Sequence, residues 1–168
     1  MGFAAQSLSA KSSAGSPCLR FLNAARSRAV DADRGTGSAI LIRGGDILNH
    51  QLTTNANSFT PVDATLIPTG ELRSVKGTPF DFTQQTAIGA RVNQDDEQLK
   101  FGSGYDHNFV VNGQTGVMRQ AAKVSEPTTG RVKEVWTTEP GVQLYIGNFL
   151  SEMKGKAGKS YNRRHGFC

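Results

Sequence analysis

A carboxylate and an imidazole stand side by side at Asp106 and His107, ahead of the apolar run Phe109-Val110-Val111. That run predicts a buried strand, so Asp106 falls at a junction between a loop and a strand. Gly102 and Gly104 just before it suit a tight turn or a close approach of a ligand. A scaffold can aim a polar group from such a junction into a cleft, although the same pattern also occurs in ordinary loops.

A second candidate side chain, Gln143, lies in a segment of strict period two. Val142, Leu144 and Ile146 fall on one face, whereas Gln143 and Tyr145 fall on the other. Gln143 therefore points away from the aliphatic face, where it either meets solvent or lines a polar cleft. The same alternation turns His107 to the face opposite Asp106, which predicts a packing role for the imidazole.

The elements that must position these side chains are short strands and turns. Residues 55–98 contain prolines and glycines at a density that excludes a long helix, and residues 93–98 suit at most one helical turn. Residues 121–124 and 131–138 alternate around a turn at 126–130, which indicates an antiparallel hairpin. His50 falls in a strand-like run over 47–54 and is expected to be half exposed. The pattern predicts an all-β protein with an antiparallel sandwich or barrel.

The net charge of +5 over 168 residues is concentrated at the N-terminal end. Residues 46–168 carry 13 of the 19 basic and 12 of the 14 acidic residues, so this part is almost neutral and is no nucleic-acid surface by its charge. Cys18 and Cys168 do not have the spacing of metal ligands. Phosphate-binding, dinucleotide, zinc and nucleophile-elbow motifs are absent, so we expect no cofactor and no metal.

Residues 1–30 are rich in Ala, Ser and Arg and contain no acidic residue. This composition is typical of an organelle transit peptide, and a stretch unrelated to the following domain, such as a misjoined exon, is the alternative. We expect residues 1–44 to be unrelated or disordered, with disorder over 1–36, and a cytoplasmic location unless residues 1–30 direct the chain to a plastid or mitochondrion. A strand is expected over 38–42. The longest apolar runs are too short to span a bilayer.

Six segments in order resemble the aldose 1-epimerase (galactose mutarotase) family. They read GDILNH at 45–50, PVDATLIPTGE at 61–71, GTPFDF at 77–82, GYDHNF at 104–109, TEPGVQLY at 138–145 followed by GNF at 147–149, and GFC at 166–168. The resemblance covers residues 45–168, which are therefore expected to be a partial mutarotase-like domain. It implies an incomplete antiparallel β-sandwich of the galactose mutarotase-like supersandwich type, with an open sugar cleft.

The reaction implied by the resemblance interconverts the α and β anomers of free hexoses without a cofactor. A base removes the proton of the anomeric hydroxyl while an acid protonates the ring oxygen, and the opened ring closes on the other face. The family's acid His belongs to a motif shortly before residue 45, and its base Glu follows the GFC segment. Neither is present in this sequence, so no catalytic residue is intact. Asp106 and Gln143 match substrate-binding residues of the family.

The resemblance therefore predicts a mutarotase-family chain that has lost its activity. Two alternatives remain open: a remnant carbohydrate-binding module, or a basic RNA-interacting protein. The RNA-interacting alternative would bind through residues 1–45 and through the basic tail, which contains Lys154, Lys156, Lys159, Arg163 and Arg164. The expected partner is a small sugar such as galactose or glucose, with no nucleic acid and no membrane. Exposed sheet edges predict poor solubility or self-association.

Overall fold

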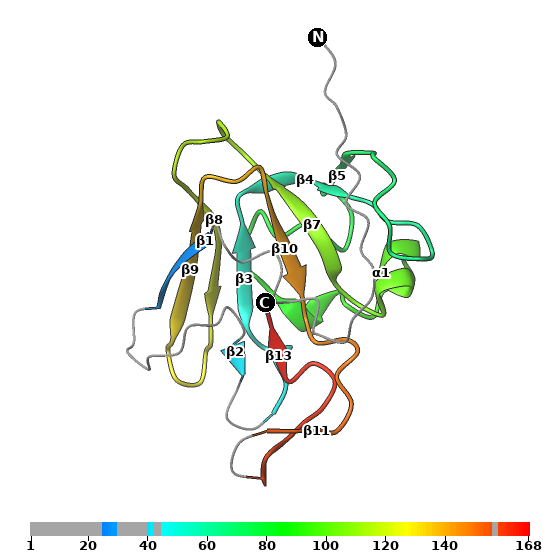
Figure 1. The fold of residues 1–168 in the computed structure, drawn as a ribbon, viewed down its shortest axis with the longest axis vertical. Coiled ribbons are helices and arrows are strands. Elements are labelled where there is room, and N and C mark those ends of the chain that lie inside the picture. The colour runs from blue at the N-terminus through cyan, green and yellow to red at the C-terminus, as the bar shows by residue number, and fades with distance from the viewer. Residues whose placement is uncertain (1–24, 30–39, 42–44, 156–157) are drawn as a thin grey trace.

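The computed structural model describes residues 25–29, 40–41, 45–155 and 158–168, and these form mainly antiparallel strands (Figure 1). One sheet has the order β1 (Ala25–Ala29), β9 (Val132–Thr137), β8 (Arg119–Ser125), β3 (Gln51–Thr54) and β6 (Thr86–Ala87). The second has the order β10 (Gly141–Tyr145), β7 (Asp106–Val111), β4 (Ala56–Thr60) and β5 (Arg73–Ser74). The all-β, antiparallel prediction is confirmed.

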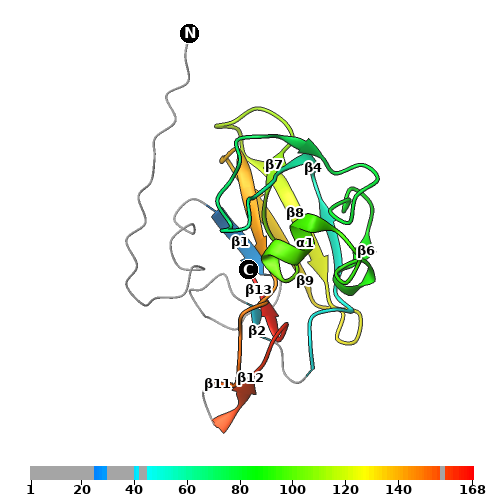
Figure 2. The ribbon, with the colours of Figure 1, turned by 90° about the vertical axis from the view of Figure 1, so that its right-hand side faces the viewer.

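Two small sheets and two short helices complete the described part. β11 (Met153–Lys154) pairs with β12 (Ser160–Tyr161), and the segment that carries both projects from the rest of the protein (Figure 2). β13 (Gly166–Phe167) pairs with β2 (Ile40–Leu41). The helices are α1 (Glu97–Gly102) and a 3₁₀-helix, Ile88–Ala90. No helix among the described residues is long and apolar enough to cross a membrane.

The core lies between the two large sheets because each presents one apolar face to the other. Leu52 and Val124 come from the five-stranded sheet, and Phe59, Phe109 and Leu144 come from the four-stranded sheet. Burial alternates residue by residue along β7, with His107, Phe109 and Val111 turned inward. This alternation is the period-two pattern expected from the sequence, and it turns Asp106 outward.

The predicted hairpin is confirmed by the antiparallel pairing of β8 with β9. Glu126 shapes its turn, because the two carboxylate oxygens accept hydrogen bonds from the backbone N–H groups of Thr128 and Thr129 at 2.7 Å each. Hydrogen bonds to its charged form, including one from the Thr129 hydroxyl, lower the pKa of Glu126 to about 2.

α1 begins later than the helical turn that the sequence placed at 93–98. Asp96 is its N-cap, and the carboxylate accepts hydrogen bonds from the N–H groups of Gln98 and Leu99. The helix ends at Gly102, and its C-cap Ser103 adopts the left-handed conformation with φ of 53°. The chain then turns directly into β7, so the end of α1 helps to set the position of Asp106.

Within the segment expected to be disordered over 1–36, Ala25–Ala29 form β1 and pair with β9 through the register Ala25–Thr137 to Ala29–Lys133. β2 falls within the strand expected over 38–42. The remainder of the segment predicted as unrelated or disordered, residues 1–24, 30–39 and 42–44, lies outside the described residues.

Candidate functional site

Asp106 and Gln143 are brought together although 37 residues separate them in the sequence. β7 and β10 pair antiparallel, with Tyr145 opposite Asp106 and Gln143 opposite Asn108. The Nε2 atom of Gln143 donates a hydrogen bond to Oδ1 of Asp106 at 2.9 Å. Both side chains stand on the outer face of the four-stranded sheet. The two residues that the sequence singled out are therefore neighbours at one end of one strand pair.

The carboxyl group of Asp106 is half-buried, and burial is the main cause that raises its pKa above the ordinary value. The hydrogen bond from Gln143 acts in the opposite direction because it stabilises the carboxylate. An ionised carboxylate has more lone-pair sites than this one donor occupies, and the Gln143 amide also carries an acceptor oxygen. The pair can therefore accept hydrogen bonds from the hydroxyl groups of a polyol.

The outer face that carries Asp106 and Gln143 is polar across β10, β7 and β4. Asn108 and Thr60, which the sequence did not single out, extend it. Asn108 lies two positions after Asp106 in β7, and its Nδ2 atom donates to Oγ1 of Thr60 in β4 at 3.2 Å. On the other side Asn108 lies over Gly141 of β10, where a Cβ atom would come within 2.4 Å of the Asn108 Oδ1 atom. Period-two alternation counted from Asp106 was the signal that could have found Asn108.

An aromatic pair borders this face at the end of β10. The rings of Tyr145 and Phe149 stack with centroids 6.3 Å apart and an angle of 18° between their planes. The Tyr145 hydroxyl accepts a hydrogen bond from the Phe149 backbone N–H at 3.1 Å. Phe149 is 56% exposed, so its apolar surface is open to contact beside the polar groups.

His107 lies on the inner side of β7, as the alternation predicted. It is completely buried, and its ring centroid lies 4.7 Å from that of Phe80 and 5.9 Å from that of Phe59. Its Nδ1 atom accepts a hydrogen bond from the Asp106 backbone N–H at 3.1 Å. Burial lowers the pKa of His107 to about 4. The imidazole is therefore neutral at physiological pH and packs beneath Asp106 on the far side of the strand.

The turn before Asp106 is held by Asn148, whose role the sequence did not indicate. The buried Nδ2 of Asn148 donates hydrogen bonds to the backbone oxygens of Gly102 and Tyr105, each at 2.9 Å. Gly104 lies under this amide with φ of 134°, and a Cβ there would lie 2.4 Å from the Asn148 Oδ1 atom. Gly104 is thus required both by its conformation and by the close approach, as its position in the sequence suggested.

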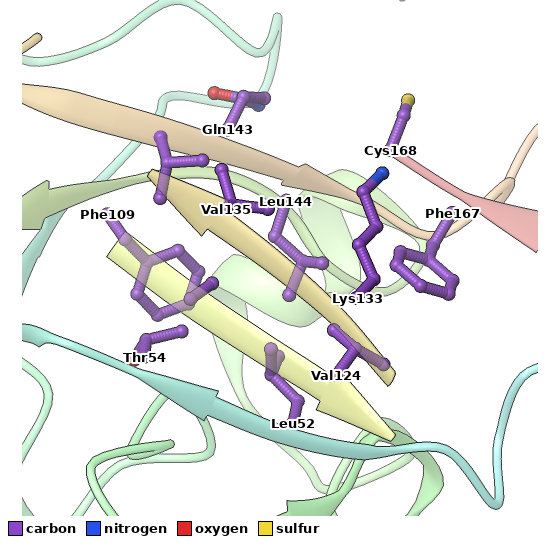
Figure 3. Close-up of a pocket in the computed structure, with 12 residues that line it drawn as sticks. Leu52, Thr54, Phe109, Val124, Lys133, Val135, Gln143, Leu144, Phe167 and Cys168 are labelled. Carbon is purple, nitrogen blue, oxygen red and sulfur yellow. The ribbon is translucent and has the colours of Figure 1, made fainter. Parts of the chain in front are cut away.

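A small cavity of about 50 Å³ lies on the other side of β10, between the two large sheets (Figure 3). Its lining is almost entirely apolar and includes Phe109, Val135, Val142 and Leu144. In Figure 3 the side chain of Gln143 lies on the opposite side of the β10 ribbon from Leu144. Gln143 is among the residues that line the cavity, but its side chain stands on the other side of β10, on the face that carries Asp106.

His50 corrects a prediction. The sequence suggested a half-exposed strand residue, but the side chain is only 5% exposed and precedes β3. Its ring meets the edge of Phe167 with centroids 5.9 Å apart, and burial lowers its pKa. Phe167, which packs on the His50 ring, lies near the far end of the chain, and periodicity within a short window cannot predict such a contact. Among the described residues no three His, Cys, Asp or Glu side chains gather in a way that would hold a metal ion.

The comparisons with known proteins agree on one family. The family model for aldose 1-epimerase matches residues 38–168. The chain is 44% identical to galactose mutarotase from Bos taurus over 124 residues, which are 73% of this chain and 34% of that protein. It is 36% identical to aldose 1-epimerase from Escherichia coli over 116 residues, or 69% of this chain and 33% of that protein. The chain thus spans about a third of the length of these curated relatives.

Solved structures of related proteins show the same fold. Galactose 1-epimerase from Lactobacillus acidophilus superimposes with a TM-score of 0.58 at 30% identity, over 73% of this chain and 34% of that chain. An aldose epimerase homologue from C. elegans superimposes with a TM-score of 0.61 at 27% identity, over 73% of this chain and 35% of that chain.

Proposed function

Because the chain belongs to the aldose 1-epimerase family, an isomerase family, we propose that it binds free hexoses such as galactose and glucose through Asp106 and Gln143. The observation that carries this proposal is the hydrogen bond between these two side chains on the outer face of the four-stranded sheet. The Asp106 carboxylate accepts hydrogen bonds from hydroxyl groups of the sugar, and Gln143 holds the carboxylate in place. Asn108 and Thr60 continue the same polar face.

We assign the interconversion of hexose anomers to proteins that carry the family's acid and base as well, and not to these 168 residues alone. Ring opening requires a base at the anomeric hydroxyl and an acid at the ring oxygen, and each placed group contributes about a hundred- to ten-thousandfold. Asp106 alone cannot supply both proton transfers. His107 faces the core with a pKa of about 4, so it does not serve as the acid. We expect mutarotation by the 168-residue chain at the rate of the buffer.

Binding is tested by calorimetry with galactose at millimolar concentration. The chain should bind the sugar, and Asp106→Asn should weaken binding about tenfold because hydrogen bonds to a charged acceptor contribute about 1.5–3 kcal/mol. Asp95→Asn is the control, since Asp95 is an exposed carboxylate whose partner is Lys100. Absence of binding by the wild-type chain, or equal binding by Asp106→Asn, contradicts the proposed site.

Catalysis is tested by polarimetry with fresh α-D-glucose. Clear acceleration by the 168-residue chain would show that the expected loss of activity is wrong. A chimera tests whether these residues support activity in a full-length relative. In it, residues 45–168 replace the matched third of the galactose mutarotase from Bos taurus. The chimera should accelerate mutarotation, and its Asp106→Asn variant should lose most of that rate. An inactive but folded and sugar-binding chimera would favour the remnant carbohydrate-binding module.

A further inference from the structure

Tyr145 stands beside the Asp106 carboxylate on the outer face of the four-stranded sheet. The two residues lie directly opposite each other in β10 and β7, as a pair without mutual backbone hydrogen bonds, in which side chains approach most closely. Burial is the main cause that raises the pKa of the Tyr145 phenol, and the charge of Asp106 raises it further. The Tyr145 backbone also exchanges hydrogen bonds of 2.9 and 2.8 Å with Cys168. Strand neighbours on both sides therefore fix its position.

One hydrogen bond links the turn that carries Phe149 to the turn that precedes Asp106. Asn148 is buried, and its Nδ2 atom donates to the Tyr105 oxygen at 2.9 Å. Asp106 is the next residue after Tyr105, and Phe149 is the next residue after the asparagine. The Phe149 N–H in turn donates to the Tyr145 hydroxyl at 3.1 Å. The Phe149 backbone and the Asp106 backbone are thus held in a fixed relation to each other.

The rings of Tyr145 and Phe149, together called the aromatic wall, give the polar face an apolar border. They stack at an angle of 18° between their planes, and Phe149 is 56% exposed, so much of its ring is open to contact. The Tyr145 hydroxyl accepts the hydrogen bond from Phe149 and still carries its own proton, which it can donate. Apolar area beside a few fixed polar groups is typical of a site for a small molecule.

A pyranose ring matches this combination, because its hydroxyl groups lie around the ring edge and its C–H groups form apolar faces. We propose that the aromatic wall determines which hexose binds, a selection that rests on the proposed sugar binding at Asp106 and Gln143. In galactose the axial 4-hydroxyl leaves the hydrogens of C3, C4 and C5 on one face, and this face packs on the Phe149 ring. In glucose the hydrogen of C4 points to the opposite face, so the contact is smaller and binding is weaker.

Calorimetry with galactose and with glucose, each at millimolar concentration, tests this selection. The wild-type chain should bind galactose about threefold more tightly than glucose. Phe149→Ala should weaken galactose binding about fivefold and glucose binding less than about twofold, because the ring is lost while the backbone N–H remains. Phe149→Trp should keep the preference, since it restores an aromatic ring. Trp136→Ala is the control, because Trp136 is an exposed ring in β9 of the other sheet.

Saturation-transfer NMR shows which sugar hydrogens touch the ring. Irradiation of the aromatic resonances should mark the hydrogens on C3, C4 and C5 of galactose most strongly. Phe149→Leu, which keeps an apolar side chain without aromatic hydrogens, should lose this pattern. Equal wild-type affinity for the two sugars, an equal loss for both in Phe149→Ala, or an unchanged pattern in Phe149→Leu would each overturn the selection.

Asp106→Asn separates this selection from the proposed function. It should weaken galactose and glucose binding alike, because hydroxyl groups of both sugars need the carboxylate. If Asp106→Asn weakens both sugars and Phe149→Ala changes neither, only the aromatic wall is wrong. If the wild-type chain binds neither sugar, or if Asp106→Asn has no effect, the binding site itself is wrong and the selection fails with it.

Discussion

Packing in the four-stranded sheet differs between its central strands, β7 and β4, here called the closed end, and its edge strand β10, here called the open end. Where β4 and β7 run together, Phe59 and Phe80 stack with ring centroids 4.3 Å apart, and Tyr105, His107 and Phe109 surround Phe80. All five side chains are essentially inaccessible to solvent. At β10, by contrast, Val142 borders a cavity and Phe149 stands exposed.

The difference shows how the two regions contribute to stability and to recognition. The closed end fixes the inner side of β7, so the outer side of the same strand can hold a half-buried carboxylate in a defined position. At the open end Leu144 is buried in the core, but Val142 is only half-buried and the side chains of Gln143 and Phe149 are accessible to solvent. Stability should therefore depend most on residues beneath Asp106, and recognition on residues beside Gln143.

Removal of an aromatic ring should give the largest difference between the two ends in the loss of free energy of unfolding. Phe80→Ala deletes a fully buried ring and leaves a cavity, which costs about 3–5 kcal/mol in the free energy of unfolding. Phe149→Ala removes the same side chain from the open end, where only the stacking on Tyr145 is lost, at a cost of about 1 kcal/mol. Urea denaturation at one fixed protein concentration measures both, and equal losses would show that the two ends do not differ.

Acid should destabilise the closed end through His107. Its pKa is lowered from 6.5 to about 4 in the folded state, so the unfolded chain binds the proton more tightly. The contribution of the neutral His107 to the free energy of unfolding is fully present above pH 6.5 and is lost as the pH falls toward 4. Below pH 4 it no longer changes, and the total loss is on the order of 3 kcal/mol. Thermal or urea unfolding between pH 7 and about 4 records this profile.

The variant His107→Leu should flatten most of the slope over that range, while His165→Gln should keep it because both buried histidines remain. A His107→Leu profile as steep as that of the wild-type chain would assign the acid sensitivity elsewhere. His50 is the other buried histidine with a lowered pKa, and it gives the residual slope expected in His107→Leu.

The sequence predicts the parts of this arrangement that rest on local patterns. Alternation placed Val142, Leu144 and Ile146 inward and Gln143 outward, and the turn at 126–130 placed the β8–β9 hairpin. The meeting of Asp106 with Gln143 follows from neither pattern, because it requires the register between β7 and β10.

Long-range contacts account for the residues that the sequence missed or placed wrongly. Asn148 reaches backbone oxygens 43 and 46 residues earlier in the chain. His50 is buried against Phe167 near the other end of the sequence. Ala25–Ala29, which lie in the segment predicted from its composition to be disordered, pair with β9. In each case the partner is distant in sequence, and periodicity within a short window carries no information about it.

Two adjacent alanines in β8 provide the smallest and most local test of the open end. Ala122 lines the cavity of about 50 Å³, whereas the fully buried Ala121 is not among its lining residues. Ala122→Val should fill part of the cavity and raise the free energy of unfolding by about 0.5–1 kcal/mol, the usual gain from filling a cavity. Ala121→Val should instead cost about 1–3 kcal/mol because no space receives the added methyl groups. Opposite signs in urea denaturation would locate the loose packing between β8 and β10, and a loss in both variants would show that this end is packed as tightly as the other.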